Sequence, residues 1–111
     1  MIRKLVRSVI RDARVTHAGS AALQIDAYVL RAAEILPFEE VEIVNQTTGA
    51  HLRTWIEAAE EGSGEVRMHS GAKPGDIITI ACYGMFHEGQ TLDHKARVIR
   101  LDAQNRLLSA M

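Results

Sequence analysis

The sequence predicts a small, mainly β protein that curls into a barrel and carries one or two short helices. Short runs rich in Val, Ile and Thr occur about seven times, which is typical of strands. Turn-forming residues separate these runs about every 8–12 residues, a spacing typical of small barrels. The length of 111 residues suits one hydrophobic core, so we expect a single domain over residues 1–111.

Residues 2–18 are expected to form one or two strands, because Val and Ile recur among them. A second interpretation is open, since the arginines of this stretch recur at helical spacing. They are Arg3, Arg7, Arg11 and Arg14. A basic amphipathic helix of this kind is typical of a membrane-surface or targeting segment. We favour strands, because Asp12 interrupts the basic face and no cleavage signal follows.

A helix is predicted over residues 27–35. Asp26 can accept hydrogen bonds from the first turn as an N-cap, and Val29, Leu30 and Ala33 fall on one face. Pro37 lacks a backbone N–H, so the helix is expected to end before it.

Five further strands are predicted after this helix. They cover residues 41–45, 51–58, 66–69, 77–83 and 96–102. The first alternates apolar and polar side chains as a half-buried strand does, whereas the nearly continuous apolar run at 77–83 favours a central strand. Turns rich in Gly, Pro and polar residues separate them. We expect residues 86–94 to be irregular and residues 103–105 to turn into a short tail.

Composition and charge exclude several classes of partner. The formal net charge of −1 argues against nucleic acid as a partner. Cys82 is the only cysteine, so we expect no internal disulfide and a reducing, cytoplasmic setting. No run of about 18 apolar residues is present, and we therefore expect no membrane span. The five histidines are scattered without metal-ligand spacing, so no metal site is expected.

The dipeptide Gly19-Ser20 permits two interpretations. As a turn, glycine supplies a positive φ and serine hydrogen-bonds to nearby backbone. Alternatively, the bond between the two residues is one that the protein cuts in itself. Residue chemistry alone favours the turn, because Gly-Ser is common in turns.

The order of several segments along the chain resembles that of the aspartate 1-decarboxylase family. The most specific segments are Val15-Thr16-His17-Ala18, Asn45 to Gly49, Glu60 to Gly64 and Pro74-Gly75-Asp76. The resemblance covers the chain from Met1 to about Asn105. It implies a double-psi β-barrel, a homotetramer with active sites between neighbouring subunits, and a pyruvoyl-dependent lyase of pantothenate biosynthesis. The substrate implied is a small amino acid, by default L-aspartate, which would be converted to β-alanine.

The resemblance also implies a self-processing reaction. The hydroxyl of Ser20 would attack the Gly19 carbonyl, and the resulting ester would eliminate to leave a dehydroalanine, which hydrolyses to an N-terminal pyruvoyl group. Thr54 stands where the family places a threonine that assists this step. The pyruvoyl ketone would then form a Schiff base with the substrate amine and act as an electron sink. The expected products are residues 1–19 and 20–111.

Other positions differ from the family pattern. His51 occupies the position of the family arginine that binds the substrate carboxylate. Trp55 occupies that of the tyrosine proton donor, and His69 that of an asparagine. The resemblance implies that Gly71 and Ala72 belong to the small-residue loop of the substrate site, which is shorter here. A family lysine falls on Val9, and Arg11 or Arg7 could supply the missing positive charge from the first strand.

The hairpin before the reactive serine is shorter here than in the family. Counting back from Ile25-Asp26 places the family serine at Ala22, so a reactive Ser20 requires a deletion before it and two extra residues after it. Two alternatives therefore stay open. One is an uncleaved enzyme on the same barrel that uses His51, His69, Thr54 and His17 for acid–base chemistry. The other is a non-catalytic oligomeric module.

Overall fold

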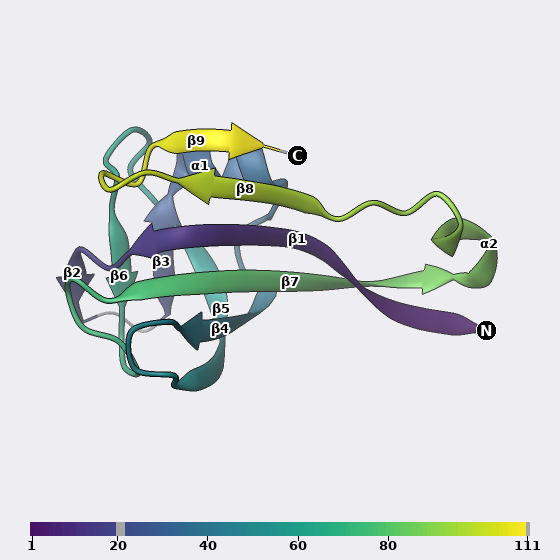
Figure 1. Ribbon diagram of the computed structural model, residues 1–111, viewed down its shortest axis with the longest axis horizontal. Coiled ribbons are helices and arrows are strands. Elements are labelled where there is room, and N and C mark those ends of the chain that lie inside the picture. The colour runs from purple at the N-terminus through teal and green to yellow at the C-terminus, as the bar shows by residue number, and fades with distance from the viewer. Residues whose placement is uncertain (20–21, 111) are drawn as a thin grey trace.

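The computed structural model describes residues 1–19 and 22–110, which contain nine strands and two short helices joined by loops (Figure 1). In chain order they are β1 (Ile2–Arg14), β2 (His17–Ala18), β3 (Leu23–Asp26), α1 (Ala27–Ala33), β4 (Glu40–Asn45), β5 (His51–Ala59), β6 (Val66–Met68), β7 (Ile77–His87), α2 (Glu88–Thr91), β8 (Arg97–Leu101) and β9 (Leu107–Ala110). The mainly β fold with two short helices confirms the fold class predicted from the sequence.

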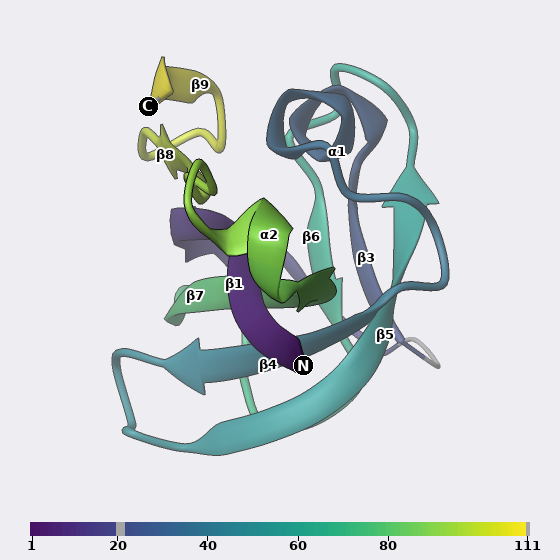
Figure 2. The same cartoon turned by 90° about the vertical axis from the view of Figure 1, so that its right-hand side faces the viewer.

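The strands form one sheet in the order β2-β6-β3-β5-β4-β7-β1-β8-β9. Figure 2 shows that this sheet curls around a central space, with α1 at the opening between β8 and β3. Backbone hydrogen bonds help the sheet to close, because the amide of Thr16 donates to the carbonyl of Val66 (2.8 Å) and that of Val15 to Asp76 (2.9 Å). The curled sheet is consistent with a double-psi β-barrel.

Aliphatic side chains fill the inside of the curled sheet. Fully buried members include Ile10, Leu23, Ile25, Ile43, Ile56, Met68, Ile78, Ile80 and Ile99. In β4 the odd-numbered positions Val41 and Ile43 are buried while Glu40 and Glu42 point outward, which is the alternation predicted from the sequence. The β4–β5 pair therefore has an apolar inner face and a charged outer face.

Helix α1 begins and ends through specific polar contacts. The Asp26 carboxylate accepts a hydrogen bond from the Tyr28 amide (2.9 Å), which confirms the predicted N-cap. The helix ends at Ala33, earlier than predicted, because Glu34 adopts a left-handed conformation with φ of 60°. The carbonyl of Ala33 then accepts from the Ser8 hydroxyl (2.6 Å), and that of Glu34 from Arg7 (2.6 Å). These contacts fix α1 against β1.

Two segments are more regular than the sequence predicts. Residues 86–94 were expected to be irregular, but β7 continues to His87 and α2 follows it. The reason is pairing, since the start of β1 supplies hydrogen-bond partners from Ile2 opposite His87 to Leu5 opposite Gly84. This paired extension and α2 form an arm that projects from the barrel (Figure 1). The whole molecule, arm included, measures 42 × 24 × 22 Å.

The predicted tail also forms a strand. Asn105 adopts φ of 59° and turns the chain back, so that β9 pairs with β8. The Asn105 side chain holds this turn by donating to the carbonyls of Arg14 (2.8 Å) and Gly64 (2.9 Å). No single stretch of sequence carries these long-range contacts, which explains why the tail was not predicted as a strand.

Candidate functional site

Gly19 lies where the chain crosses from one side of β6 to the other. It directly follows β2, and β6 lies between β2 and β3 in the sheet. Its backbone φ is +82°, and its amide donates to the carbonyl of Met68 (2.9 Å), the last residue of β6. Glycine adopts this conformation without steric cost. Ser20, the predicted reactive residue, lies outside the described residues.

Thr54 lies in the first half of β5, just before the position where β5 begins to pair with β3. The two strands are parallel, with Leu23 opposite Ile56, so Thr54 precedes the first paired position by two residues. The side chain of Thr54 is buried, and its hydroxyl makes no hydrogen bond to a residue within 1–19 or 22–110. A threonine hydroxyl can donate one hydrogen bond and accept others. The parallel pairing therefore places this polar group two residues before the position opposite Leu23, where β3 begins.

Trp55 lies on the opposite face of β5 from Thr54. It is half-exposed, and its indole N–H donates to the Glu57 carboxylate (2.7 Å). His51 is exposed on the same outer face, where it pairs with Val44 of β4. Arg53, which was not predicted as a site residue, lies on this face between His51 and Trp55. The strict alternation of exposed and covered positions from 51 to 56 is the signal that could have identified it.

The loop that follows β6 packs against the start of β5. His69 is exposed immediately after Met68. Gly71 has a φ of +78°, and a methyl group at this position would lie 2.5 Å from Cδ2 of Leu52. Ala72 packs against the hydrophobic core. The loop therefore approaches β5 through Gly71 and Leu52, the residue that follows His51 in the chain.

Asn45 and Asp76 hold the base of this loop. The Asn45 side-chain amide donates to the Gly71 carbonyl (3.0 Å) and to the Asp76 carboxylate (2.9 Å). The hydrogen bond from Asn45, together with one from the Lys73 amide, lowers the pKa of Asp76. The buried carboxylate is thus ionised at neutral pH and fixes the loop conformation.

The candidate arginines of β1 lie apart from this group. Arg11 is exposed opposite Arg100 of β8 and borders a cavity of about 250 Å³ on that side of the sheet. Arg7 forms an ion pair with Glu39 (2.6 Å) and donates to Sγ of Cys82 (3.0 Å). Within one chain, therefore, Arg11 is not brought to the residues around Gly19 and Thr54.

Cys82 and His17 are engaged in local contacts. Burial raises the pKa of the Cys82 thiol, against the opposing effect of Arg7, which is the behaviour expected of a core thiol. Nδ1 of His17 lies 2.7 Å from the Thr16 hydroxyl and 3.9 Å from the Glu65 carboxylate. Neither residue points to a second reactive centre in the described part of the chain.

Within residues 1–19 and 22–110, no three His, Cys, Asp or Glu side chains gather in a group that could hold a metal ion. The described helices are all too short to cross a bilayer.

The curled sheet, with a positive-φ glycine directly after β2 and a buried threonine on β5, is the arrangement to set beside known proteins. The family model for aspartate decarboxylase matches residues 1–108, so the chain belongs to the aspartate decarboxylase family. An aspartate 1-decarboxylase of Staphylococcus epidermidis is 36% identical over 115 residues, which cover 97% of this chain and 90% of the relative. Aspartate 1-decarboxylase of Listeria monocytogenes is 33% identical over 108 residues, covering 94% and 84% of the two chains. The resemblance seen in the sequence is thereby confirmed.

Proposed function

We propose that this protein is a pyruvoyl-dependent decarboxylase of a small amino acid, with L-aspartate as the default substrate and β-alanine as the product. The observation that carries the proposal is the family match across residues 1–108, together with relatives named aspartate 1-decarboxylase. These relatives do not favour the uncleaved acid–base enzyme or the non-catalytic module.

In the proposed processing reaction, the Ser20 hydroxyl adds to the Gly19 carbonyl and the peptide bond becomes an ester. Elimination releases the Gly19 carboxylate and leaves a dehydroalanine at position 20. One water then hydrolyses this group to a pyruvoyl group with release of ammonia. Two observations support the site. Gly19 has a positive φ with its amide bound to Met68, and Thr54, whose hydroxyl has no partner within 1–19 or 22–110, lies two residues before the position opposite Leu23 of β3. Thr54 would donate to the oxyanion that forms at Gly19.

The pyruvoyl group, once formed, supplies the electron sink for loss of carbon dioxide. The chain's own residues would bind and orient the substrate. We assign His51, His69 and the backbone of Gly71 and Ala72 to substrate binding, from the family resemblance and because Gly71 lies against Leu52 at the start of β5. Trp55 has only an indole N–H to offer, so its role would be to donate a hydrogen bond to the substrate in place of the one it donates to Glu57.

A neighbouring copy is part of the proposal. Arg11 on β1 is separated from His51 on β5 by two strands, β4 and β7. In this proposal it would therefore reach the site of an adjacent subunit in a homotetramer. An arginine fork binds a carboxylate better than a histidine does. Arg11 would therefore supply the charge lost where His51 replaces the family arginine.

The test is direct detection of cleavage. Purified protein is incubated, separated on a denaturing gel and weighed by mass spectrometry. We expect two products, residues 1–19 and 20–111, from the parent chain and from a Ser63→Ala control. Ser20→Ala should stay intact, and Thr54→Ala should be cleaved at least tenfold more slowly. A parent chain that remains whole at 12.3 kDa after prolonged incubation would refute the proposal.

A further inference from the structure

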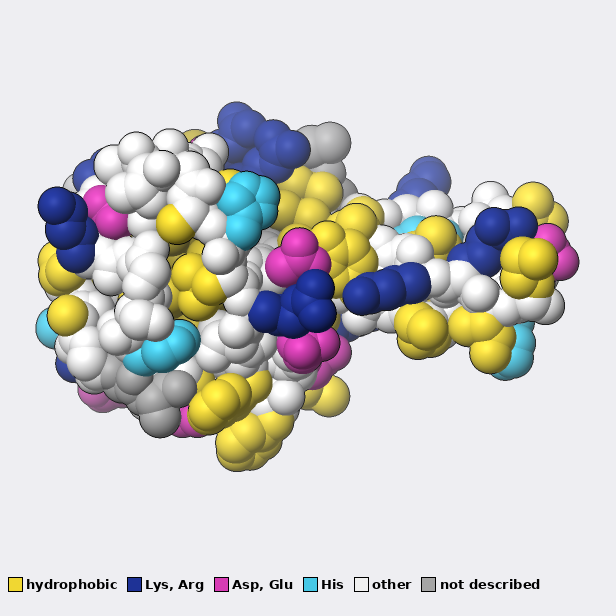
Figure 3. Space-filling view, turned by 90° about the horizontal axis from the view of Figure 1, so that it is seen from below, with side chains coloured by type: hydrophobic (Ala, Val, Ile, Leu, Met, Phe, Trp, Pro, Cys, Tyr) yellow, Lys and Arg dark blue, Asp and Glu magenta, His cyan; other side chains and the backbone are white. Residues whose placement is uncertain are grey.

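A cavity of about 350 Å³ lies on the outer face of the sheet, outside the group around Gly19 and Thr54. Lys4, Arg53, Glu40, Glu42, Tyr83 and Met85 are among the residues that line it. In Figure 3, basic and acidic side chains lie next to one another where the arm joins the barrel. The volume is at the lower end of the range for small-molecule sites, so it suits a ligand of few atoms.

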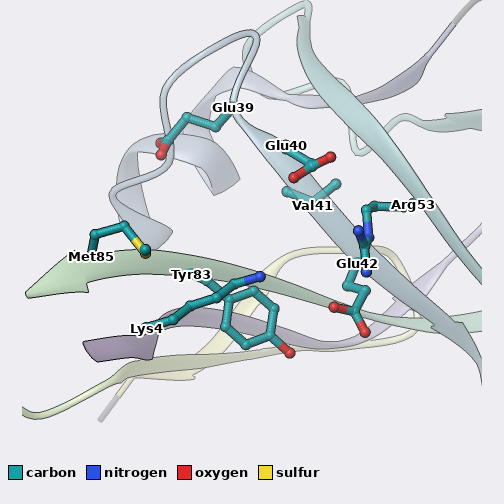
Figure 4. Close-up of a pocket in the computed structure, with 8 residues that line it drawn as sticks. All are labelled: Lys4, Glu39, Glu40, Val41, Glu42, Arg53, Tyr83 and Met85. Carbon is teal, nitrogen blue, oxygen red and sulfur yellow. The ribbon is translucent and has the colours of Figure 1, made fainter. Parts of the chain in front are cut away.

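Sheet pairing fixes the positions of the charged groups. Glu42 of β4 lies directly opposite Arg53 of β5, and both point to the outer face. On the far side of the cavity, Lys4 of β1 lies opposite Met85 of β7. Figure 4 shows the ends of Lys4, Arg53 and Glu42 directed toward the same space, with Glu40 above them. Four strands therefore converge on one charged cavity.

Most of the charged side chains in the cavity form no hydrogen bond or ion pair within the described residues. A fifth charged lining residue, Glu39, is already satisfied, because it pairs with Arg7 (2.6 Å) and accepts from the Leu36 amide (2.7 Å). The other four have no side-chain hydrogen bond or ion pair with any residue in 1–19 or 22–110. These are Lys4, Arg53, Glu40 and Glu42. The Lys4 ammonium lies over the Tyr83 ring, 5.0 Å from its centre, which directs it into the cavity.

We propose that this cavity binds a small zwitterionic amino acid. Its carboxylate would bind Arg53 and Lys4, and its ammonium group would bind Glu42 and Glu40. A ligand with both charges satisfies both pairs, whereas a simple acid or amine leaves one pair of like charges unsatisfied. The short carbon chain would contact Tyr83 and Met85. The proposal does not depend on cleavage or on a pyruvoyl group.

Binding is tested in the Ser20→Ala chain, which cannot form a pyruvoyl group. β-Alanine is the probe, and propionate and propylamine are one-charge controls of similar length. The fluorescence of Trp55, the only tryptophan, reports binding because it lies two residues from Arg53 on the same face. We expect saturable binding of β-alanine at least tenfold tighter than either control. Equal binding of all three, or no saturation with β-alanine, would overturn the proposal.

Charge-removing variants locate the site. Arg53→Met and Glu42→Gln should each weaken β-alanine binding at least tenfold, while Arg53→Lys keeps the charge and most of the affinity. The matched controls Arg100→Met and Glu61→Gln remove exposed charges outside the cavity and should leave binding unchanged. Unaltered affinity in Arg53→Met and Glu42→Gln would refute the assignment.

The two proposals fail separately. Binding in Ser20→Ala without cleavage of the parent chain would remove the decarboxylase proposal and leave this site. Cleavage without saturable β-alanine binding would do the reverse. Protein-detected NMR titration of the same variants confirms that each is folded and that the shifted signals come from the cavity.

Discussion

At the scale of single residues, Asp26 connects the helix to a distant loop. Besides the Tyr28 amide, its buried carboxylate accepts from the amides of Gly62 (2.8 Å) and Gly64 (3.0 Å). Burial alone would raise the pKa of Asp26, but these three backbone hydrogen bonds and the charge of Arg106 outweigh it, so the pKa is lowered. One carboxylate thus holds three backbone donors that would otherwise be unsatisfied.

Asp26→Ala should lower the free energy of unfolding by about 2–3 kcal/mol, because an N-cap and two further charged hydrogen bonds are lost. Denaturant unfolding at neutral pH measures this value. The matched control Asp93→Asn alters an exposed carboxylate with no side-chain partner in the described residues and should change it little.

The same residue predicts a dependence of stability on pH. Since the pKa of Asp26 is lower in the folded chain, its contribution is fully present above the unfolded value of about 4 and is lost as pH falls through the folded value. The difference between parent and Asp26→Asn should therefore shrink in acid. A difference that stays constant down to about pH 2 would contradict this role.

At the scale of elements, the loop before β6 and the turn before β9 support each other through Gly64. This residue has a φ of +68°, and a methyl group on it would lie 2.9 Å from the carbonyl oxygen of Gln104. Its own carbonyl accepts from Asn105, and its amide donates to Asp26. The close approach of two backbones requires glycine at this position.

Gly64→Ala should therefore destabilise the protein by about 1–3 kcal/mol, from backbone strain and displacement of the neighbouring turn. Thermal unfolding followed by circular dichroism measures the effect. Gly89→Ala is the control, because Gly89 lies in α2 with a negative φ and open space around it, and it should be neutral or slightly stabilising. Equal melting temperatures for parent and Gly64→Ala would rule out this account.

Local patterns predicted the elements that depend on local chemistry. The alternation in β4, the apolar run of β7 and the cap at Asp26 could all be read from neighbouring residues. The strand β9 and the extension of β7 could not, because each depends on pairing with a segment far away in the chain.

The candidate site was predictable to a similar extent. The positions of Gly19 and Thr54 followed from a resemblance that spans the chain, and the parallel pairing of β3 with β5 places Thr54 at the end where β3 begins. The cavity around Arg53 was missed, because it needs side chains from four strands whose order in the sheet differs from their order in the sequence.

At the scale of the whole molecule, the projecting arm exposes apolar side chains. Ile2 is 58% exposed, and Leu92, just after α2, is 87% exposed. Apolar groups gathered on a projecting element are typical of a contact between protein chains. The arm is therefore our candidate for a contact in the proposed homotetramer.

Light scattering after size-exclusion chromatography should give a mass about four times that of one chain for the parent protein. Ile2→Asp combined with Leu92→Asp should lower this mass, because a charged group in an apolar contact is left unpaired. Leu108→Asp is the control, since Leu108 is also 63% exposed but lies on β9, away from the arm. A monomeric parent, or an unchanged mass in the double variant, would exclude the arm from this role.

The central place of β1 has a consequence for the processed form. This strand lies between β7 and β8, buries Ile10 and Ala13, and continues into β2, whose partner is β6. A backbone nick after Gly19 would release no piece, because the short N-terminal peptide would stay interlocked with the remainder along its whole length. The nicked protein would behave as a tight heterodimer of peptide and body, which separates only when the entire barrel is unfolded.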